Sequence, residues 1–408
     1  MYMNLFNTIL NPRCNHKAFN IAGTKDKRAI TAQFVSTYIE PSRLLGANKS
    51  LRNIKMGNME IHSGEHLRLG DLKANQFKLI IRKCEIGQTG EEKRSRLDLE
   101  SIVTKSAESI RRDGFINYFG LQRFGSSSIL THTIGIEILK GNYDEAVNLL
   151  LCPRDEAKHK SYLIPVREAW KATKNASLAL DKLEKKHTTE GKVLFGLKDN
   201  PNDFVGALGR LPRTLRQMYV HAVQSLVWNQ LTSERLKKGN QIIVGDLVQP
   251  DPTEKLKVQH VTSDNIASFT MEDVVMTMPG FDVSYPNIIK DKLDETLGAL
   301  GLTSDCFSGS VKDYRLPGAY RKVIAKPKNF EAEVIQYEDS VHENILKSER
   351  DWLPELANKE EGKNVEVAGK ENRETSGTNQ ALIVQFELPT ASYATMALRE
   401  LLHCDEHE

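Results

Sequence analysis

The sequence predicts an α+β protein whose sheet is interrupted by a mainly helical middle. Short runs rich in Ile, Phe and Val stand in the first third, at AFNIA, ITAQFVSTYI, NMEIHSG and QFKLIIRKCE, and similar runs return after residue 240. Between them, apolar residues recur at the spacing of amphipathic helices. We expect early and late strands to pair across this middle, because insertions are tolerated where chain ends meet in space.

The first third combines these strand-like runs with two helices. Pro41 begins a helical turn in PSRLLGAN, and SIVTKSAESIRRDG keeps its apolar residues at helical spacing until Gly114. Gly, Pro and Asn separate the segments, which is typical of the loops between strands.

Residues 130–240 are predicted to be mainly helical. The candidates are YDEAVNLLL, the long KNASLALDKLEKKH, and RTLRQMYVHAVQSLVWNQLTSERLKK, in which one apolar stripe comprises Leu215, Met218, Val223, Leu226 and Val227. Strands are expected again at QIIVGDLVQ, EDVVMTMPG, YRKVIAKP and ALIVQFELP. Residues 346–380 are polar, charged and almost free of aromatics, which predicts a disordered loop.

Composition indicates a globular chain of 408 residues with 39% hydrophobic residues, long enough for two or three domains. No apolar run reaches the about 18 residues that span a bilayer. The amino terminus also lacks a signal-peptide pattern, so we expect a soluble, intracellular protein. The five cysteines stand singly, which favours neither a zinc module nor a disulfide framework.

Charge is distributed unevenly. Residues 1–125 hold 21 Lys and Arg against 12 Asp and Glu, although the whole chain carries only +2. An excess of basic residues in this third is consistent with a surface that binds a polyanion such as a nucleic acid. A charged face that only contacts solvent would show the same excess.

Asp26 is a lone carboxylate in GTKDKRAIT, between two strand-like runs. In one interpretation this is a solvated turn in which glycine supplies an unusual backbone angle. In the other, the flanking strands hold the carboxylate rigidly, and Lys25, Lys27 and Arg28 keep it ionised or contact phosphates.

The segment GFINYFGLQRFG, residues 114–125, packs four aromatics and three glycines into twelve positions. These aromatics can be core filler beside a turn, or a stacking surface for a base with Arg123 near a phosphate. Two later segments, LPGAYRKVIAKP and FELPTASYATMALREL, can each be explained by capping and packing. Trp228 is interpreted as a residue of a helix core.

Several common catalytic patterns are absent from the sequence. It contains no GxxxxGK[ST] phosphate loop, no GxGxxG, no GxSxG and no HExxH, and its histidines lack a wider set of ligands at metal-site spacing. The sequence therefore argues against a nucleotide site, a metal site and a serine nucleophile.

In this order and spacing, four segments resemble the blocks of the TruD-type pseudouridine synthases, in particular their eukaryotic branch. GTKDKRAIT resembles the catalytic block, NYFGLQRFG the second, GAYRKVI the third and LPTASYATMALREL the fourth. VHAVQSLVWN and MPGFDVSYP resemble segments of the insertion domain. The resemblance implies the pseudouridine synthase catalytic fold, a mixed, mainly antiparallel sheet with flanking helices, split by a mainly helical insertion domain.

The domain boundaries expected from this resemblance divide the chain into three. Residues 1–119 would form the first part of the catalytic domain and 120–326 the insertion domain. Residues 327–408 would form the second part of the catalytic domain, with the disordered loop at about 346–380.

The resemblance also carries roles over to individual residues. Asp26 matches the catalytic aspartate, and Phe119 matches the aromatic beside the target base. Asn117 matches a polar residue that lines the pocket, and Tyr393 an aromatic of the fourth block. The basic residues that would contact phosphate or hold Asp26 as its anion are Lys25, Lys27, Arg28, Arg123 and Arg321.

The implied reaction isomerises uridine to pseudouridine in RNA, and needs no cofactor and no metal because it involves neither a redox step nor phosphoryl transfer. The carboxylate can act as a nucleophile at C1′ or at C6, or as a base that gives a glycal. The expected substrate is tRNA, with messenger RNA or small nuclear RNA as alternatives. We expect a monomer without a membrane partner, located in the nucleus or the cytoplasm.

Two departures from the family pattern leave alternatives open. Only 25 residues precede Asp26, where the family has further strands and an acidic residue, so we expect a shortened form. In the alternative hypothesis the chain is a catalytically impaired relative that acts as an RNA-binding module. A nuclease or glycosylase is disfavoured, because no second acid, histidine or metal cluster accompanies Asp26 in these motifs. Ala74 stands where a glycine is usual, which is costly only if the backbone there has a positive φ.

Overall fold

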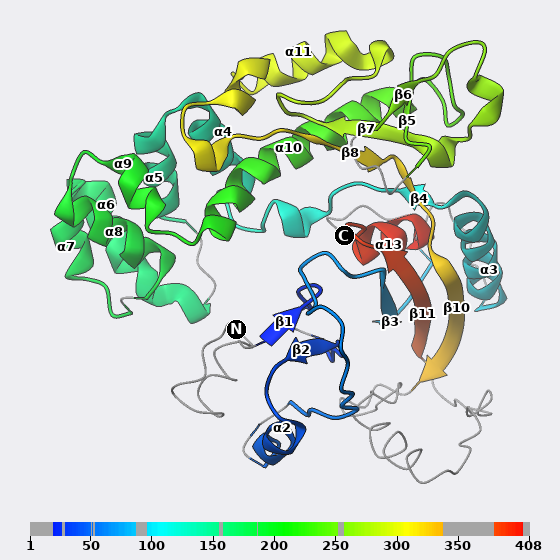
Figure 1. Ribbon diagram of the computed structural model, residues 1–408, viewed down its shortest axis with the longest axis horizontal. Helices are drawn as coiled ribbons and strands as arrows, with labels where there is room; N and C mark the ends of the chain where they lie inside the picture. Colours follow the sequence, from blue (N-terminus) through cyan, green and yellow to red (C-terminus); the bar gives the residue numbers. More distant parts are fainter. Residues whose placement is uncertain are drawn as a thin grey trace. The chain divides into compact units, whose positions relative to one another are not determined.

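The computed structural model describes residues 19–26, 29–49, 51, 54–86, 96–154, 158–185, 187–251, 257–337 and 379–402. The chain forms two compact units, one comprising 1–108 and 327–391, the other 109–326 and 392–408 (Figure 1). The division between them falls within helix α3 (Arg96–Asp113), which ends at Gly114 with a φ of 75°. The family-based boundaries after residues 119 and 326 stay predictions.

The main sheet of the first unit joins strands from the two ends of the sequence. Its antiparallel order is β10 (Lys328–Tyr337), β11 (Asn379–Pro389) and β3 (Ala74–Arg82) (Figure 1). Phe386 of β11 lies opposite Phe77 of β3, with ring centroids 5.5 Å apart, and also stacks on Phe330 at 5.3 Å. The predicted pairing of early with late strands is therefore confirmed. Of the disordered loop expected at about 346–380, residues 346–378 lie outside the described residues, and Asn379 and Gln380 begin β11.

A second, smaller ladder in this unit pairs β1 (Phe19–Ile21) with β2 (Val35–Thr37), followed by helix α2 (Pro41–Ala47). The long strand expected at ITAQFVSTYI is thus only three residues. The prediction of a strand at NMEIHSG is wrong. In this part of the structure Asn58 has a φ of 51° and Ile61 is 93% exposed, so neither the backbone angle nor burial favours pairing with another strand.

The second unit contains most of the helices, as predicted for the middle of the chain. Its helices are α4 (Thr131–Lys140), α5 (Tyr143–Leu151), α6 (Ile164–Thr173), α7 (Ala176–Leu180), α8 (Thr189–Asp199), α9 (Phe204–Gly209), α10 (Arg213–Leu236), α11 (Lys290–Ala299) and α13 (Ala394–Leu402). The helix expected over KNASLALDKLEKKH is only the five residues of α7, and Asn175 caps it by accepting from the N–H groups of Ser177 and Leu178.

Helices α4 and α10 pack closely. A Cβ on Gly135 of α4 would stand 2.1 Å from the carbonyl oxygen of Tyr219 on α10, so this position admits only glycine. The buried face of α10 includes Val223 and Val227 as predicted, but Met218 is 39% exposed. The prediction that Met218 belongs to the buried stripe is therefore wrong, because a helix of 24 residues meets different neighbours along its length.

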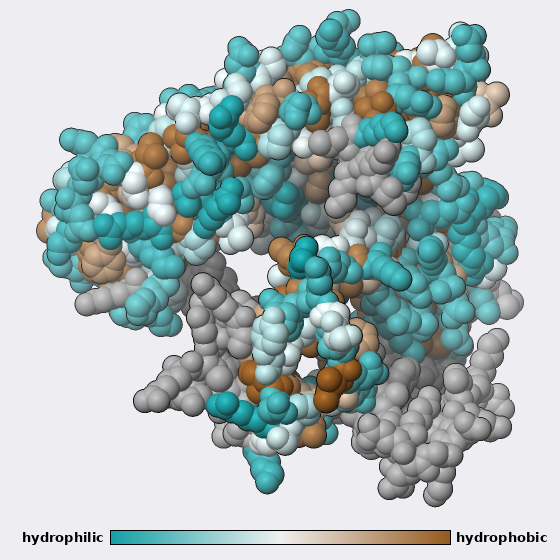
Figure 2. All heavy atoms as spheres, in the orientation of Figure 1, coloured by the Kyte–Doolittle hydropathy of each residue, from teal (hydrophilic) through white to brown (hydrophobic). Residues whose placement is uncertain are grey.

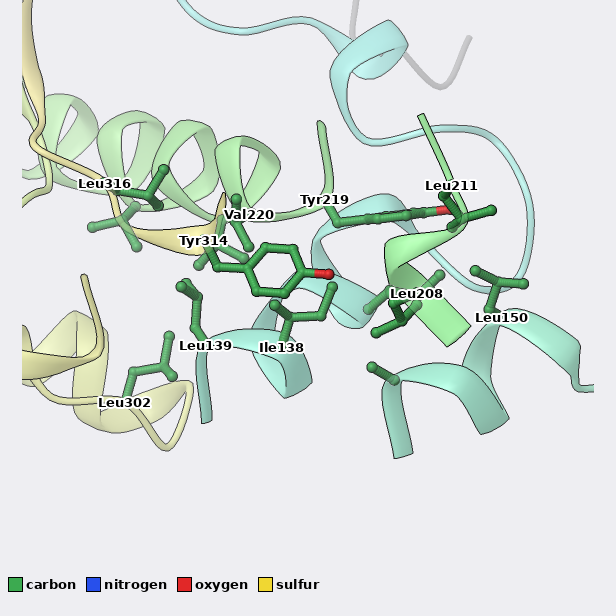
Figure 3. Close-up of a cluster of buried hydrophobic side chains, with 14 of the residues drawn as sticks. Ile138, Leu139, Leu150, Leu208, Leu211, Tyr219, Val220, Leu302, Tyr314 and Leu316 are labelled. Carbon is green, nitrogen blue, oxygen red and sulfur yellow. The ribbon is translucent and has the colours of Figure 1, made fainter. Parts of the chain in front are cut away.

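The core of the second unit is assembled mainly from aliphatic side chains of several helices. Figure 3 shows part of it, where side chains of α4, α5, α9 and α10 surround the buried rings of Tyr219 and Tyr314. Burial raises the pKa of Tyr219 to about 12. This core gives α10 a fixed support, and α10 in turn positions residues of the site described below.

Two small sheets complete the second unit. One has the order β6 (Gln259–His260), β5 (Leu247–Val248), β7 (Val274–Met278) and β8 (Ala319–Lys322); the other pairs β4 (Phe115–Ile116) with β9 (Ile324–Ala325). Every strand pair among the described residues is antiparallel. The α+β class is thus confirmed. Within the described ranges no helix is long and apolar enough to cross a membrane.

Candidate active site

Asp26 lies where the sequence predicts it, in the connection that leaves β1 and leads to β2, and its side chain is exposed. The segment before β3 holds this connection in place. The N–H of Gly70 donates to the carbonyl of Ala22 at 2.9 Å, and Nζ of Lys25 donates to Oδ1 of Asn75. The residues just before Asp26 are therefore tied to β3.

The β1–β2 ladder is too short to be stable alone, because an isolated two-stranded ladder is marginal in water. Leu44 and Ala47 of α2 form a small apolar cluster with half-buried neighbours that include Phe19 and Ile39. Phe34 and Tyr38, by contrast, are each 85% exposed, and Figure 2 shows hydrophobic side chains at the surface around these elements.

The backbone angle at Ala74, where the family usually has a glycine, decides between the two alternatives left open by the sequence. Ala74 is the first residue of β3 and pairs with Pro389 of β11. It is not among the described residues with a positive φ. Alanine therefore fits this position without strain.

In the second unit, Arg321 of β8 and Asn117 are joined by several hydrogen bonds. Nε and Nη2 of Arg321 donate to the main-chain oxygen of Asn117 at 3.0 and 2.7 Å, and Nη2 also donates to its Oδ1 at 2.8 Å. The Nδ2 of Asn117 donates in turn to the carbonyl of Lys322 at 3.1 Å. Both side chains are buried, and burial lowers the pKa of Arg321 to about 10, which leaves it positively charged at neutral pH.

The guanidinium of Arg321 lies against a group of aromatic rings, which we call the aromatic–arginine cluster: Phe119, Trp228, Arg321 and Tyr393. Its Cζ is 4.0 Å from the centroid of Phe119, 5.2 Å from that of Trp228 and 5.9 Å from that of Tyr393. The shortest of these distances places the cation over the face of Phe119, since an approach from the edge would leave it farther away. Phe119 meets Trp228 edge to face, with centroids 5.6 Å apart, and Tyr393 at 5.9 Å.

One face of α10 holds the segment that carries Phe119. Three polar side chains spaced four residues apart each contact it: Ser225 accepts from Nε of Arg123 at 3.0 Å, Asn229 bonds the backbone of Phe119, and Ser233 bonds the hydroxyl of Tyr118 at 2.7 Å. Residues spaced by four lie on one side of a helix. The helix thereby fixes residues 118–123 in position.

The structure thus gathers four of the predicted site residues in the second unit: Asn117, Phe119, Arg321 and Tyr393, with Arg123 bonded nearby and its Cζ 5.7 Å from the Phe119 ring. Lys25 bonds Asn75 in the first unit, and Lys27 and Arg28 lie outside the described residues. The cluster offers a partly exposed aromatic ring backed by a cation, which suits a planar base.

Sequence reasoning missed the part that α10 plays in this cluster. Trp228 is fully buried, as the interpretation of a core residue requires, and Nε1 donates to the carbonyl of Met276 at 3.0 Å. Its ring also supports Phe119, which periodicity cannot reveal. Asn229 carried no signal beyond its position next to Trp228.

A family model described as tRNA pseudouridine synthase D (TruD) matches residues 7–401. The chain belongs to the TruD family. The resemblance of its four sequence blocks to that family is therefore confirmed. A TruD protein from Methanosarcina mazei has a similar crystal structure, with a TM-score of 0.65 at 23% identity, over 99% of this chain and 85% of the other, which supports the same fold.

Two relatives with curated names are more similar in sequence. The Pseudouridylate synthase 7 homolog of Homo sapiens is 38% identical over 397 residues, which cover 96% of this chain and 55% of the relative. The Multisubstrate pseudouridine synthase 7 of Schizosaccharomyces pombe is 34% identical, with 95% and 58% covered. The chain therefore spans somewhat more than half the length of these relatives.

Proposed function

We propose that this TruD-family chain isomerises uridine to pseudouridine in RNA, with Asp26 as the catalytic carboxylate. The observation that carries the proposal is the partly exposed ring of Phe119, backed by the buried cation of Arg321 at 4.0 Å. Membership of the family over residues 7–401 and the names of the relatives support it.

The aromatic–arginine cluster suits the binding step of this reaction. An enzyme that acts on a base must take the base out of its stack, which costs a few kcal/mol, and a ring that stacks on the base offsets that cost. Phe119 would supply the ring, Tyr393 would form one side of the pocket, and Asn117 would line it. Arg123 and Lys25 would contact backbone phosphates.

The chemical step needs one carboxylate and conserves every atom of the substrate. The C1′–N1 bond breaks, the base rotates, C5 bonds to C1′ and the proton at C5 leaves to solvent while N1 gains one. Asp26 would act as the nucleophile at C1′ or C6, or as the base that removes a sugar proton. Lys27 and Arg28, which follow it in the sequence, would contact backbone phosphates.

The test incubates the purified chain with an unmodified tRNA transcript and measures pseudouridine by nucleoside mass spectrometry. We expect the wild type to form product, and Asp26→Asn to form none while it binds the RNA with unchanged affinity. Salt-sensitive binding without product in the wild type would instead indicate an RNA-binding module. Free uracil or cleaved strands would indicate a glycosylase or nuclease, and neither binding nor product would overturn the proposal.

The remaining expectations about partners follow from this proposal. Messenger RNA and small nuclear RNA transcripts in the same assay compare the substrate classes with tRNA. Pseudouridine formation that persists in EDTA would support an enzyme that needs no metal. Sedimentation of the active fraction at the mass of one chain would support a monomer. We propose a location in the nucleus or the cytoplasm, which imaging of a tagged chain tests.

A further inference from the structure

The backbone of Phe119 is bound by a side chain where a strand partner would be expected. β4 pairs with β9 through Ile116, and the N–H of Asn117 still donates to the carbonyl of Val323 at 2.8 Å. At Phe119, the N–H donates to Oδ1 of Asn229 at 2.9 Å, and the carbonyl accepts from Nδ2 of the same side chain at 2.9 Å.

This pair of bonds has the form that two opposite residues make in an antiparallel ladder, where one residue exchanges both hydrogen bonds with its partner. Near neutral pH, where carboxyl groups are ionised, only the primary amides of Asn and Gln carry a donor and an acceptor side by side on the same carbon. Aspartate can accept from the N–H of Phe119 but cannot donate to its carbonyl, and alanine can do neither. The chemistry of the contact is therefore specific to an amide.

We propose that Asn229 is a positioning residue for Phe119, which sets the direction of the ring that holds the target base. The inference rests on the function proposed above. Asn229 directly follows Trp228, whose ring meets Phe119 edge to face at 89°. Because the two residues are consecutive on α10, one rigid helix fixes both the backbone and one side of the Phe119 ring.

A positioning role predicts an effect on turnover rather than on RNA affinity, because the bond from Asn229 goes to protein backbone. For Asn229→Ala we expect kcat to fall about 10- to 100-fold with KM for the tRNA transcript little changed, as small displacements in a site have effects of this size. Asn229→Asp keeps one of the two bonds and should give an intermediate kcat. Hydrogen exchange should show faster exchange of the Phe119 amide in the alanine variant than in the aspartate variant.

The matched control is Asn265→Ala, which removes a side-chain amide that also bonds backbone but lies outside the aromatic–arginine cluster. Oδ1 of Asn265 accepts from the N–H of Thr262 at 2.8 Å and its Nδ2 donates to the carbonyl of His260 at 3.1 Å, so this variant should leave kcat and KM unchanged. Melting temperatures of all variants identify any that fail to fold, and if Asn229→Ala does so, Asn229→Asp decides the question.

The outcomes separate the two proposals. A wild type that forms pseudouridine supports the function, whatever the variants do. Wild-type kcat in a folded Asn229 variant whose Phe119 amide exchanges rapidly would overturn the positioning role alone, and an equal loss of kcat in the Asn265 control would do the same. A wild type that forms no product overturns both.

Discussion

The guanidinium of Arg321 stacks on the ring of Phe119, with Cζ 4.0 Å from the ring centroid. The same guanidinium donates to both oxygens of Asn117, which stands two residues before Phe119 in the sequence. One buried side chain thus fixes a polar residue and an aromatic residue of the same segment relative to each other.

This double role predicts that Arg321→Lys is not conservative. A lysine ammonium cannot reproduce the planar fork of donors, so at least one oxygen of Asn117 loses its partner inside the protein. We expect the free energy of unfolding to fall by about 1–3 kcal/mol in a urea titration. The control is Arg315→Lys, an exposed arginine 5.4 Å from the ring of Phe281, whose replacement should change stability by no more than about 0.5 kcal/mol. Equal effects at the two positions would contradict the assigned role.

The detached uracil must rotate within the site during the reaction. Replacement of Phe119 tests the hypothesis that its ring holds the plane of the base and, lacking a hydroxyl, leaves the edge of the base free to turn. Phe119→Ala should weaken stabilisation of the extruded uridine by about 1–3 kcal/mol, the usual value of one base–aromatic stack. Phe119→Tyr adds a hydroxyl that can bond the uracil edge, and should slow turnover while RNA affinity is retained. Single-turnover assays and filter binding measure both effects, and unchanged turnover in both variants would refute the hypothesis.

The pH dependence of stability should depend in part on His221 of α10. Burial lowers the pKa of His221, against a hydrogen bond with Gln224 that raises it, and Arg123 lowers it further. Between that lowered pKa and the ordinary value near 6.5, the unfolded chain binds more protons than the folded one. The contribution of neutral His221 to the free energy of unfolding is therefore fully present above about pH 6.5, and it decreases as the pH falls through this window.

Thermal melts at about pH 7.5 and about pH 5.5 measure this effect. The wild type should lose melting temperature at the lower pH, and His221→Asn should lose less. Burial lowers the pKa of His132 as well, so the difference between the two pH values should shrink without vanishing. A steeper loss in His221→Asn would show that the sign is wrong.

Two alanines should respond in opposite directions to replacement by glycine. Ala74 is extended in β3, so Ala74→Gly should lower the free energy of unfolding by about 0.5–1 kcal/mol. Ala391 has a φ of 64°, where a side chain is strained, so Ala391→Gly should raise it by about 0.5–1 kcal/mol. Denaturant titration of both variants checks the signs, and each serves as the control of the other.

The sequence predicted the elements whose apolar pattern reflects burial. α5 and α10 begin and end close to the residues expected from helical spacing, and β11 follows the run ALIVQFELP. The failure at NMEIHSG has a physical reason, since Ile61 is apolar but exposed and no pattern of residue types reveals a missing partner strand. The same limit applies to α7, where the charged residues after Leu180 can extend a helix but do not bury a face.

The site was predictable where residues are close in sequence. Asn117, Phe119 and Arg123 stand in one segment, and the family pattern singled them out together with Arg321 and Tyr393. The contribution of α10 was not predictable, because Asn229 reaches Phe119 across 110 positions of the chain through a side-chain amide. Long-range polar contacts of this kind leave no periodic trace in a sequence.

The order of strands in the main sheet has a consequence for synthesis of the chain. β11 is the central strand, and its neighbour β3 is separated from it by nearly the whole of the second unit in sequence. A ribosome therefore completes residues 109–326 before the strand that closes the sheet has been translated. Until β11 emerges, β3 lacks the strand that covers one of its two edges, and unpaired edges are prone to aggregation. The nascent chain must protect β3 for longer than any other strand of this sheet.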